Sequence, residues 1–182
     1  MRLPLAVAVI AMLLSAAFAA DNTLTASEKK DGWKLLFNGK NLDGWRGYTL
    51  PSLPEAGWKV EDGILKSVAG TKGKELITVE TYDDFELSWE WRVLPGGNNG
   101  IKYFVTEQRT KAPGPEYQMI DDEKHPDGQK GGTHQTAAFY DVLAPAADKP
   151  VKPGASGTPR ASSRRAAVSS TGSTARRCWS ST

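Results

Sequence analysis

The chain has 182 residues and a mass of 19.7 kDa, which is enough for one domain of ordinary size and too little for two well-formed cores. Its 39% hydrophobic and 24% charged residues are typical of a globular protein, and 18 Gly with 11 Pro favour short strands joined by tight turns. The single cysteine, Cys178, excludes an internal disulfide framework and a zinc site built from cysteines.

Charge is distributed unevenly along the chain. Residues 151–182 contain six basic residues and no acidic residue, so the rest of the chain has 17 basic against 21 acidic residues, a net charge of −4. A mildly acidic body argues against nucleic acid as the main partner, because binding to phosphates requires a basic surface.

Residues 1–20 are predicted to be a signal peptide. Arg2 supplies a short positive region, residues 3–14 form an apolar run, and Ala17-Phe18-Ala19 fits the small-x-small cleavage pattern. A membrane anchor is the alternative, although the run is short for a spanning helix. No later apolar stretch approaches the required length. We therefore expect a secreted or periplasmic protein that has no membrane association once the signal is removed.

Short strands are predicted at regular intervals along residues 21–153, and no convincing amphipathic helix lies between them. The clearest is 85–93, where five large apolar residues alternate with four polar ones, as expected for a strand with one buried face. This pattern indicates an all-β fold of two packed antiparallel sheets. The predicted strands are 35–37, 58–60, 64–68, 75–78, 85–93, 101–105, 116–120 and 137–143.

Residues 154–182 do not continue this pattern. They are rich in Ser, Thr, Ala, Arg, Gly and Pro, which predicts a disordered basic tail. A frameshift explains them better. DNA encoding Val-Glu-His-Trp-Leu-Asn-Gly-Ala-Lys-Val-Leu-Glu-Phe, read one base late, gives residues 169–181, and DNA encoding Gly-Glu-Trp-Asn-Thr-Ala-Arg gives residues 155–160. We therefore expect a domain that lacks its last strands, followed by a frameshift product.

Several motifs together resemble the 3-keto-disaccharide hydrolase domain family, formerly the domain of unknown function 1080. The similarity runs from about Gly32 to Pro153. The family's usual C-terminal ending contains short sequences that the alternative reading frame also encodes. The resemblance implies a concanavalin A-like jelly-roll β-sandwich, export to the bacterial envelope, and hydrolysis of 3-keto-glycosides. The motifs are LFNGKNLDGW at 36–45, WKVEDGIL at 58–65, FELSWEWR at 85–92, GGNNGI at 96–101, EYQMIDD at 116–122 and AFYD at 138–141.

The substrate class implied by the resemblance sets the chemistry. A 3-keto sugar has an acidified proton on C2, so a base can remove it, the aglycone can leave by elimination, and water can add afterwards. Such a site needs a base, a group that stabilises the enolate and a general acid.

The candidate catalytic residues are Glu90, Glu116 and His134. Glu90 lies on the polar face of strand 85–93, and we expect it to share an inward-curving sheet wall with Glu116. His134 is one of two histidines and could transfer a proton near neutral pH. Each residue could instead have no catalytic role. Glu90 could form a solvated ion pair, Glu116 could lie on an exposed strand face, and His134 could be an ordinary loop residue.

Six further polar residues are candidates for binding the substrate. Asn98 and Asn99 follow a glycine pair and could instead serve a turn. Lys102 could neutralise an enolate or could cover a sheet edge. Tyr140 could contact the sugar or could cap a strand. The candidates are Arg92, Asn98, Asn99, Lys102, Gln118 and Tyr140.

An acidic cluster at Asp121, Asp122, Glu123 and Asp127 could bind calcium, but its spacing matches no complete ligand loop. We therefore expect a polar turn, with no metal and no cofactor. Two other functions remain open. One is a carbohydrate-binding module without catalysis, and the other is an inactive truncated product. The oligomeric state is not predicted.

Overall fold

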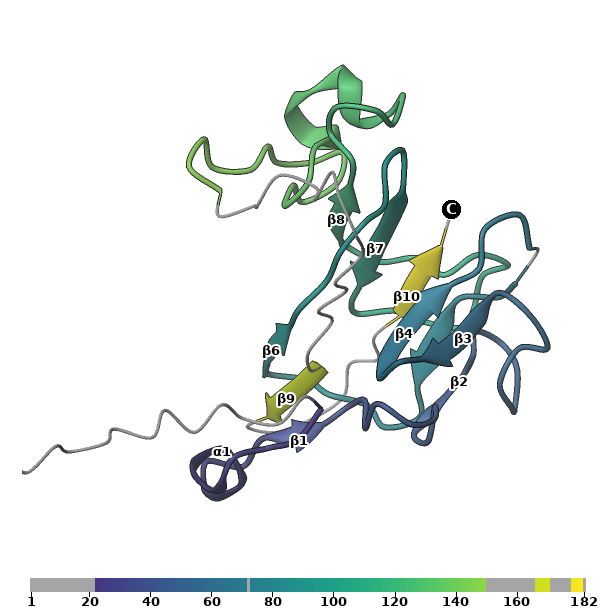
Figure 1. Ribbon diagram of the computed structural model, residues 1–182, viewed down its shortest axis with the longest axis vertical. Coiled ribbons are helices and arrows are strands. Elements are labelled where there is room, and N and C mark those ends of the chain that lie inside the picture. Colours follow the sequence, from purple (N-terminus) through teal and green to yellow (C-terminus); the bar gives the residue numbers. More distant parts are fainter. Residues whose placement is uncertain (1–21, 72, 150–165, 171–177, 182) are drawn as a thin grey trace, which may run out of the picture.

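The computed structural model describes residues 22–71, 73–149, 166–170 and 178–181 (Figure 1). The predicted signal peptide lies outside these ranges. Within them no helix has the length and apolar character needed to cross a membrane. A five-residue helix that the sequence analysis missed, α1 (Ala26–Lys30), opens the described part. Its N-terminus is held by a capping box, in which Thr25 and Glu28 satisfy each other's backbone N–H groups.

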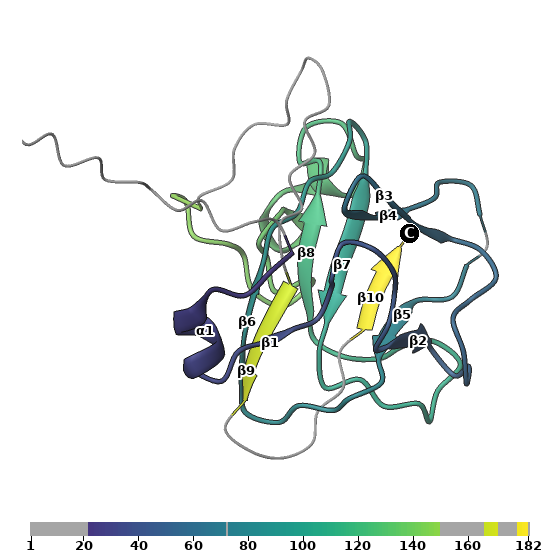
Figure 2. The ribbon, with the colours of Figure 1, turned by 60° about the horizontal axis from the view of Figure 1, so that its bottom comes forward.

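The strands of the described ranges form three antiparallel sheets (Figures 1 and 2). A three-stranded sheet has the order β1-β9-β6, a five-stranded sheet has the order β2-β5-β10-β7-β8, and β3 pairs with β4 as a hairpin. The strands are β1 (Lys34–Leu35), β2 (Trp45–Gly47), β3 (Trp58–Glu61), β4 (Ile64–Ser67), β5 (Leu76–Thr78), β6 (Phe85–Trp89), β7 (Asn98–Lys102), β8 (Glu116–Ile120), β9 (Ala166–Ser170) and β10 (Cys178–Ser181).

The two larger sheets pack face to face, which confirms the predicted all-β sandwich. Trp89 of β6 meets Tyr117 of β8 edge to face, with ring centroids 5.0 Å apart, and the Trp89 indole N–H donates to the Met119 sulfur at 3.4 Å. These contacts follow from the alternation of apolar residues along β6, which places one row of large side chains against the neighbouring sheet.

Several predicted strands differ from the observed ones. The hairpin over 58–67 and the strand at 116–120 are present, but β6 ends at Trp89 and β7 starts at Asn98, inside the predicted turn. The predicted strand 137–143 makes only isolated bridges through Phe139. Ala137 and Asp141 have φ of 68° and 62°, and these left-handed conformations interrupt a strand.

The structure places β9 and β10 in the region predicted to be a disordered tail. Each takes a central position: β9 lies between β1 and β6, and β10 lies between β5 and β7. The prediction of disorder therefore does not hold for these two segments. The other predicted tail residues lie outside the described ranges, and the frameshift origin stays a prediction.

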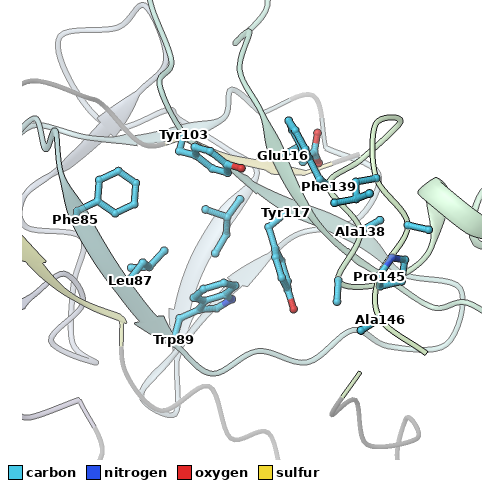
Figure 3. A pocket seen from close by; sticks show the side chains of 14 residues that line it. Phe85, Leu87, Trp89, Tyr103, Glu116, Tyr117, Ala138, Phe139, Pro145 and Ala146 are labelled. Atoms are coloured by element: carbon cyan, nitrogen blue, oxygen red, sulfur yellow. The ribbon is translucent and has the colours of Figure 1, made fainter. Parts of the chain in front are cut away.

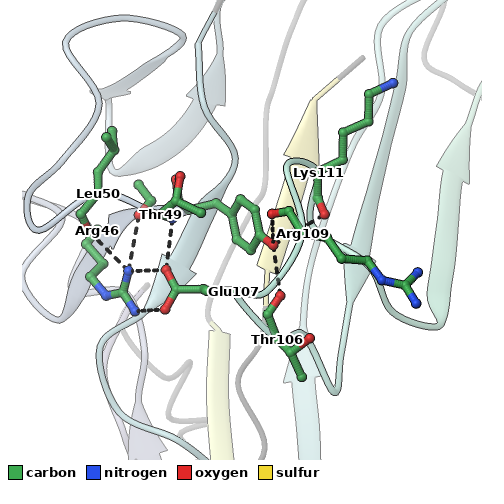
Figure 4. A network of polar contacts seen from close by, with 9 residues as sticks. Arg46, Thr49, Leu50, Thr106, Glu107, Arg109 and Lys111 are labelled. Carbon is green, nitrogen blue, oxygen red and sulfur yellow. Dashed lines mark hydrogen bonds and ion pairs between the residues drawn. The ribbon is translucent and has the colours of Figure 1, made fainter.

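A polar network fixes the loop after β7 against β2 (Figure 4). The Arg46 guanidinium makes two hydrogen bonds of 2.7 Å to the Glu107 carboxylate, which also accepts from the Thr49 N–H at 2.8 Å. The Tyr48 hydroxyl contacts the carbonyl oxygens of Thr106 and Arg109 at 2.8 and 2.9 Å. The hydrogen bond to Glu107 raises the pKa of Arg46. The network holds this loop at one end of the outer face of the five-stranded sheet.

Replacing Glu107 with glutamine is expected to destabilise the protein by about 2 kcal/mol, because it leaves the half-buried Arg46 charge without its bidentate partner. Chemical denaturation measures the change. Glu61→Gln is the matched control, because Glu61 pairs with Lys59 and Lys66 on an exposed strand. Equal shifts of the unfolding midpoint in the two variants would contradict a structural role for the network.

Candidate functional site

The outer face of the five-stranded sheet carries a row of polar side chains, which we call the outer wall: Lys102, Glu116, Gln118 and Tyr140. Lys102 pairs with Glu116 across β7 and β8. On the other side of β8, the Tyr140 N–H donates to the Glu116 carbonyl at 2.9 Å. Opposed residues share a face of a sheet, so these side chains point away from the face on which Tyr117 meets β6.

Glu116 is held within this wall by its neighbours. Its side chain is only 18% exposed, and its Oε2 lies 3.6 Å from the Lys102 Nζ. The carboxylate also lies so close to Gly100 that a Cβ at position 100 would overlap it. Gly100 is therefore needed for this placement. Gln118 is buried beside them, and its Oε1 accepts from the Met119 N–H at 3.1 Å.

A carboxylate, an imidazole and a phenol gather next to the outer wall. Asp127 precedes the short 3₁₀ helix η1 (Gly128–Lys130), and His134 ends a second one, η2 (Gly132–His134). The His134 Nδ1 lies 3.1 Å from the Asp127 Oδ1, and the Tyr140 hydroxyl donates to the Asp127 Oδ2 at 2.8 Å. The other imidazole nitrogen, Nε2, lies 3.6 Å from the Asp141 carboxylate.

Opposite pKa shifts accompany this arrangement. The hydrogen bond from Lys130, supported by the one from Tyr140 and by the nearby His134, lowers the pKa of Asp127 to about 2. Burial raises the pKa of Tyr140 to about 12, with further contributions from Asp127, Asp141 and Glu116. At neutral pH the phenol therefore stays protonated and donates to an ionised carboxylate.

The lowered pKa of Asp127 predicts a pH dependence of stability. Below about pH 4 the unfolded chain takes up a proton at Asp127 that the folded protein resists, so stability should fall as the pH falls from about 4 to 2. Thermal unfolding of the native protein and of Asp127→Asn measures this. We expect the difference in melting temperature between them to be largest above pH 4 and to shrink towards pH 2. A difference independent of pH would show that the charge does not contribute.

The predicted acidic cluster is divided among separate structural contacts. Asp121 accepts from the Gly96 N–H at 2.7 Å, which lowers its pKa, and Asp122 accepts from the Thr136 N–H at 2.7 Å and from Lys149 at 2.6 Å. Within the described ranges, no three His, Cys, Asp or Glu side chains are grouped in a way that could hold a metal ion. These carboxylates secure the loops that follow β8.

Comparison with known proteins identifies the family. The model of the 3-keto-alpha-glucoside-1,2-lyase-like domain matches residues 32–167. The chain belongs to this family. A curated relative, a 3-keto-disaccharide hydrolase from Bacteroides thetaiotaomicron, is 35% identical over 144 residues, which are 68% of this chain and 49% of the relative. The chain thus spans about half the length of that relative.

Solved structures agree with the fold of this lyase-like domain. A Parabacteroides distasonis protein described as a candidate glycosyl hydrolase is 34% identical, with a TM-score of 0.63, and the match covers 74% of this chain and 66% of that one. A second such protein from the same organism is 20% identical, with a TM-score of 0.54 and coverage of 81% and 95%, and supports the fold alone.

Most of the site residues predicted from the sequence lie together in this lyase-like domain. Four of them are on or beside the outer wall next to His134, and Asn98 shares the face of Gly100 and Lys102 in β7. Asn99 lies on the opposite face, opposed to Met119, and its Oδ1 accepts from the Gly100 N–H at 2.8 Å. The four are Lys102, Glu116, Gln118 and Tyr140.

Glu90 and Arg92 do not lie on the outer wall. β6 belongs to the three-stranded sheet, and its apolar residues face β7 and β8, so the alternating polar residues point out of the opposite side of the sandwich. Glu90 is exposed directly after this strand, and Arg92 lies in the connection to β7. The expectation that Glu90 and Glu116 share one wall is therefore not met.

Two residues of this site, Asp127 and Gly100, were not predicted as functional. Asp127 was assigned to an acidic cluster, and no role was predicted for Gly100. The contact between Asp127 and His134 depends on two successive 3₁₀ turns, which carry no periodic signal.

An apolar cavity of about 400 Å³ lies between the two sheets (Figure 3). It is lined mainly by aromatic and aliphatic side chains, including Phe85, Leu87, Trp89 and Tyr117, and Glu116 also belongs to its lining (Figure 3). Tyr117 points into it, on the face of β8 opposite to the outer wall. A lining so poor in polar groups does not suit a sugar, so the outer wall is the better candidate site.

Proposed function

We propose that this chain is the catalytic domain of an exported enzyme that cleaves 3-keto-glycosides. Family membership supports the substrate class. The observation that carries the proposal is the Glu116–Lys102 ion pair on one sheet face, with the Asp127–His134 pair beside it and connected to it through Tyr140. These groups supply the three functions that the chemistry requires, namely a base, a cation for the enolate and a proton donor.

The proposed reaction has two stages. Glu116 takes the C2 proton, and the enolate that forms on the C3 carbonyl is stabilised by Lys102. The C1–O bond then breaks, the electron pair leaves with the aglycone oxygen, and His134 gives that oxygen a proton. Water adds across the resulting C1–C2 double bond, with hydroxyl on C1 and a proton on C2. The net change is hydrolysis of the glycosidic bond.

A comparison of two substrates tests this function. We expect the protein to release nitrophenol from 4-nitrophenyl 3-keto-glucoside and not from the unoxidised glucoside, because only the keto sugar has an acidified C2 proton. In deuterated water the sugar product should carry deuterium at C2. Saturable binding of the keto-glycoside with no release would instead support a carbohydrate-binding module, and release from both substrates at equal rates would exclude the elimination route.

A further inference from the structure

We infer that Asp127 is a positioning residue that fixes the tautomer and orientation of the His134 imidazole. This inference rests on the proposed function, in which His134 transfers a proton. Neither the family match nor the sequence pattern distinguishes Asp127 from its acidic neighbours. The contacts that Asp127 makes in the structure do distinguish it from them.

The two oxygens of Asp127 are divided between different partners. Oδ1 lies 3.1 Å from the His134 Nδ1 and accepts from the Lys130 Nζ at 2.6 Å, whereas Oδ2 accepts from the Tyr140 hydroxyl at 2.8 Å. The Asp127 side chain is 17% exposed. The Nδ1 atom of His134 is buried and makes no well-aligned hydrogen bond among the described residues, so the Asp127 Oδ1 at 3.1 Å acts on it as a nearby negative charge. Lys130 and Tyr140 thus hold the carboxylate in place, and the carboxylate faces the imidazole.

The tyrosine also limits the rotation of the imidazole. The rings of His134 and Tyr140 meet edge to face, with centroids 5.2 Å apart and an interplanar angle of 84°. The chain returns towards Asp127 through Gly131 and Gly132, which have φ of 73° and 55°. No atom lies within 4 Å of a Cβ built at either glycine, so glycine is favoured there by backbone conformation and not by crowding.

This arrangement assigns different tasks to the two imidazole nitrogens. A carboxylate at Nδ1 favours a proton on Nδ1 and leaves Nε2 as the nitrogen that exchanges a proton with substrate. Nε2 faces Asp141, whose side chain is 73% exposed and loosely placed at 3.6 Å, so a substrate could displace it. The charged and titratable groups around the imidazole are Asp127, Asp141 and Tyr140, with Lys130 and Glu116 behind them.

Nitrogen-15 NMR of the full chain tests the inference directly. His125 and His134 are its only histidines, so their four ring nitrogens can be assigned by comparison with His125→Gln. At a pH where the imidazole is neutral, we expect His134 in the Nδ1–H tautomer. In Asp127→Ala we expect both tautomers at His134 and an unchanged His125. The Nε2–H tautomer in the native protein would overturn the inference, whatever the Asp127→Ala variant shows.

Kinetics with 4-nitrophenyl 3-keto-glucoside provide the second readout. We expect Asp127→Ala to lower kcat by roughly 10²-fold with little change in KM, because orientation of the proton carrier is lost while sugar contacts remain. Glu123→Gln, at an exposed position of the same loop, is the matched control and should retain native kcat. A folded Asp127→Ala protein with native kcat and a native His134 tautomer would overturn the inference.

The two readouts separate this inference from the proposed function. A native protein that shows the Asp127-dependent tautomer but no turnover would refute the proposed function and support the positioning geometry. Turnover together with a tautomer independent of Asp127 would support the function and refute the inference.

Discussion

Replacing Glu116 with glutamine should slow the release of aglycone from a 3-keto-glycoside by roughly 10²- to 10⁴-fold, because general base catalysis contributes about that much. Glutamine has nearly the shape of glutamate, so the space above Gly100 and the neighbouring Lys102 should be preserved. A carboxamide cannot accept the C2 proton. We therefore expect kcat to fall while KM and the melting temperature change little.

The matched control is Glu86→Gln. Glu86 is an exposed residue of β6, in the other sheet, and its replacement should leave the rate unchanged. Loss of activity in Glu90→Gln, combined with native activity in Glu116→Gln, would contradict the account, because it would put the chemistry on the opposite side of the sandwich.

Restoring the alternative reading frame after codon 154 should make the protein more stable. In that frame residues 178–181 become Val-Leu-Glu-Phe, so phenylalanine replaces Ser181. Residue 181 is opposed to Asn99, which in turn is opposed to Met119, the residue that contacts Trp89 between the sheets. Leucine replaces Trp179 on the same face, so the apolar area gained at position 181 is largely offset. The expected stabilisation, on the order of 1 kcal/mol, comes from the higher β-propensity of the restored strand compared with a serine-rich one.

Urea denaturation of the two chains measures this effect. We expect a higher midpoint for the frame-restored chain, together with weaker binding of a hydrophobic dye to the cavity between the sheets. A midpoint equal to or below that of the present chain would contradict the prediction. DNA sequencing around codon 154 that finds no continuation in the other frame would remove its basis.

Local patterns in the sequence predicted those elements whose structure depends on neighbouring residues. Alternation located β8 at its observed bounds, and the turn at 61–63 located the hairpin of β3 and β4. The start of β7 at Asn98 could not be predicted in this way, because it depends on pairing with Ile120, which is distant in sequence. The same holds for β9 and β10, whose partners are 70 or more residues away along the chain.

The candidate site was only partly predictable for a related reason. Alternation assigns residues to the two faces of a strand but does not say which sheet the strand joins. The i and i+2 spacing of Glu116 and Gln118 therefore puts both on one face of β8, whereas Glu90 was assigned to the same wall although β6 lies in the other sheet. The contact of Asp127 with His134 depends on loop conformation, which no periodic pattern in the sequence predicts.

A crystal structure of Glu116→Gln with a bound 3-keto-glycoside would test the location of the site most directly. The account predicts that the sugar lies on the outer wall, with C2 next to the side chain of residue 116, the C3 carbonyl next to Lys102 and the glycosidic oxygen within reach of the His134 Nε2. A sugar bound beside Glu90, or inside the apolar cavity between the sheets, would contradict it.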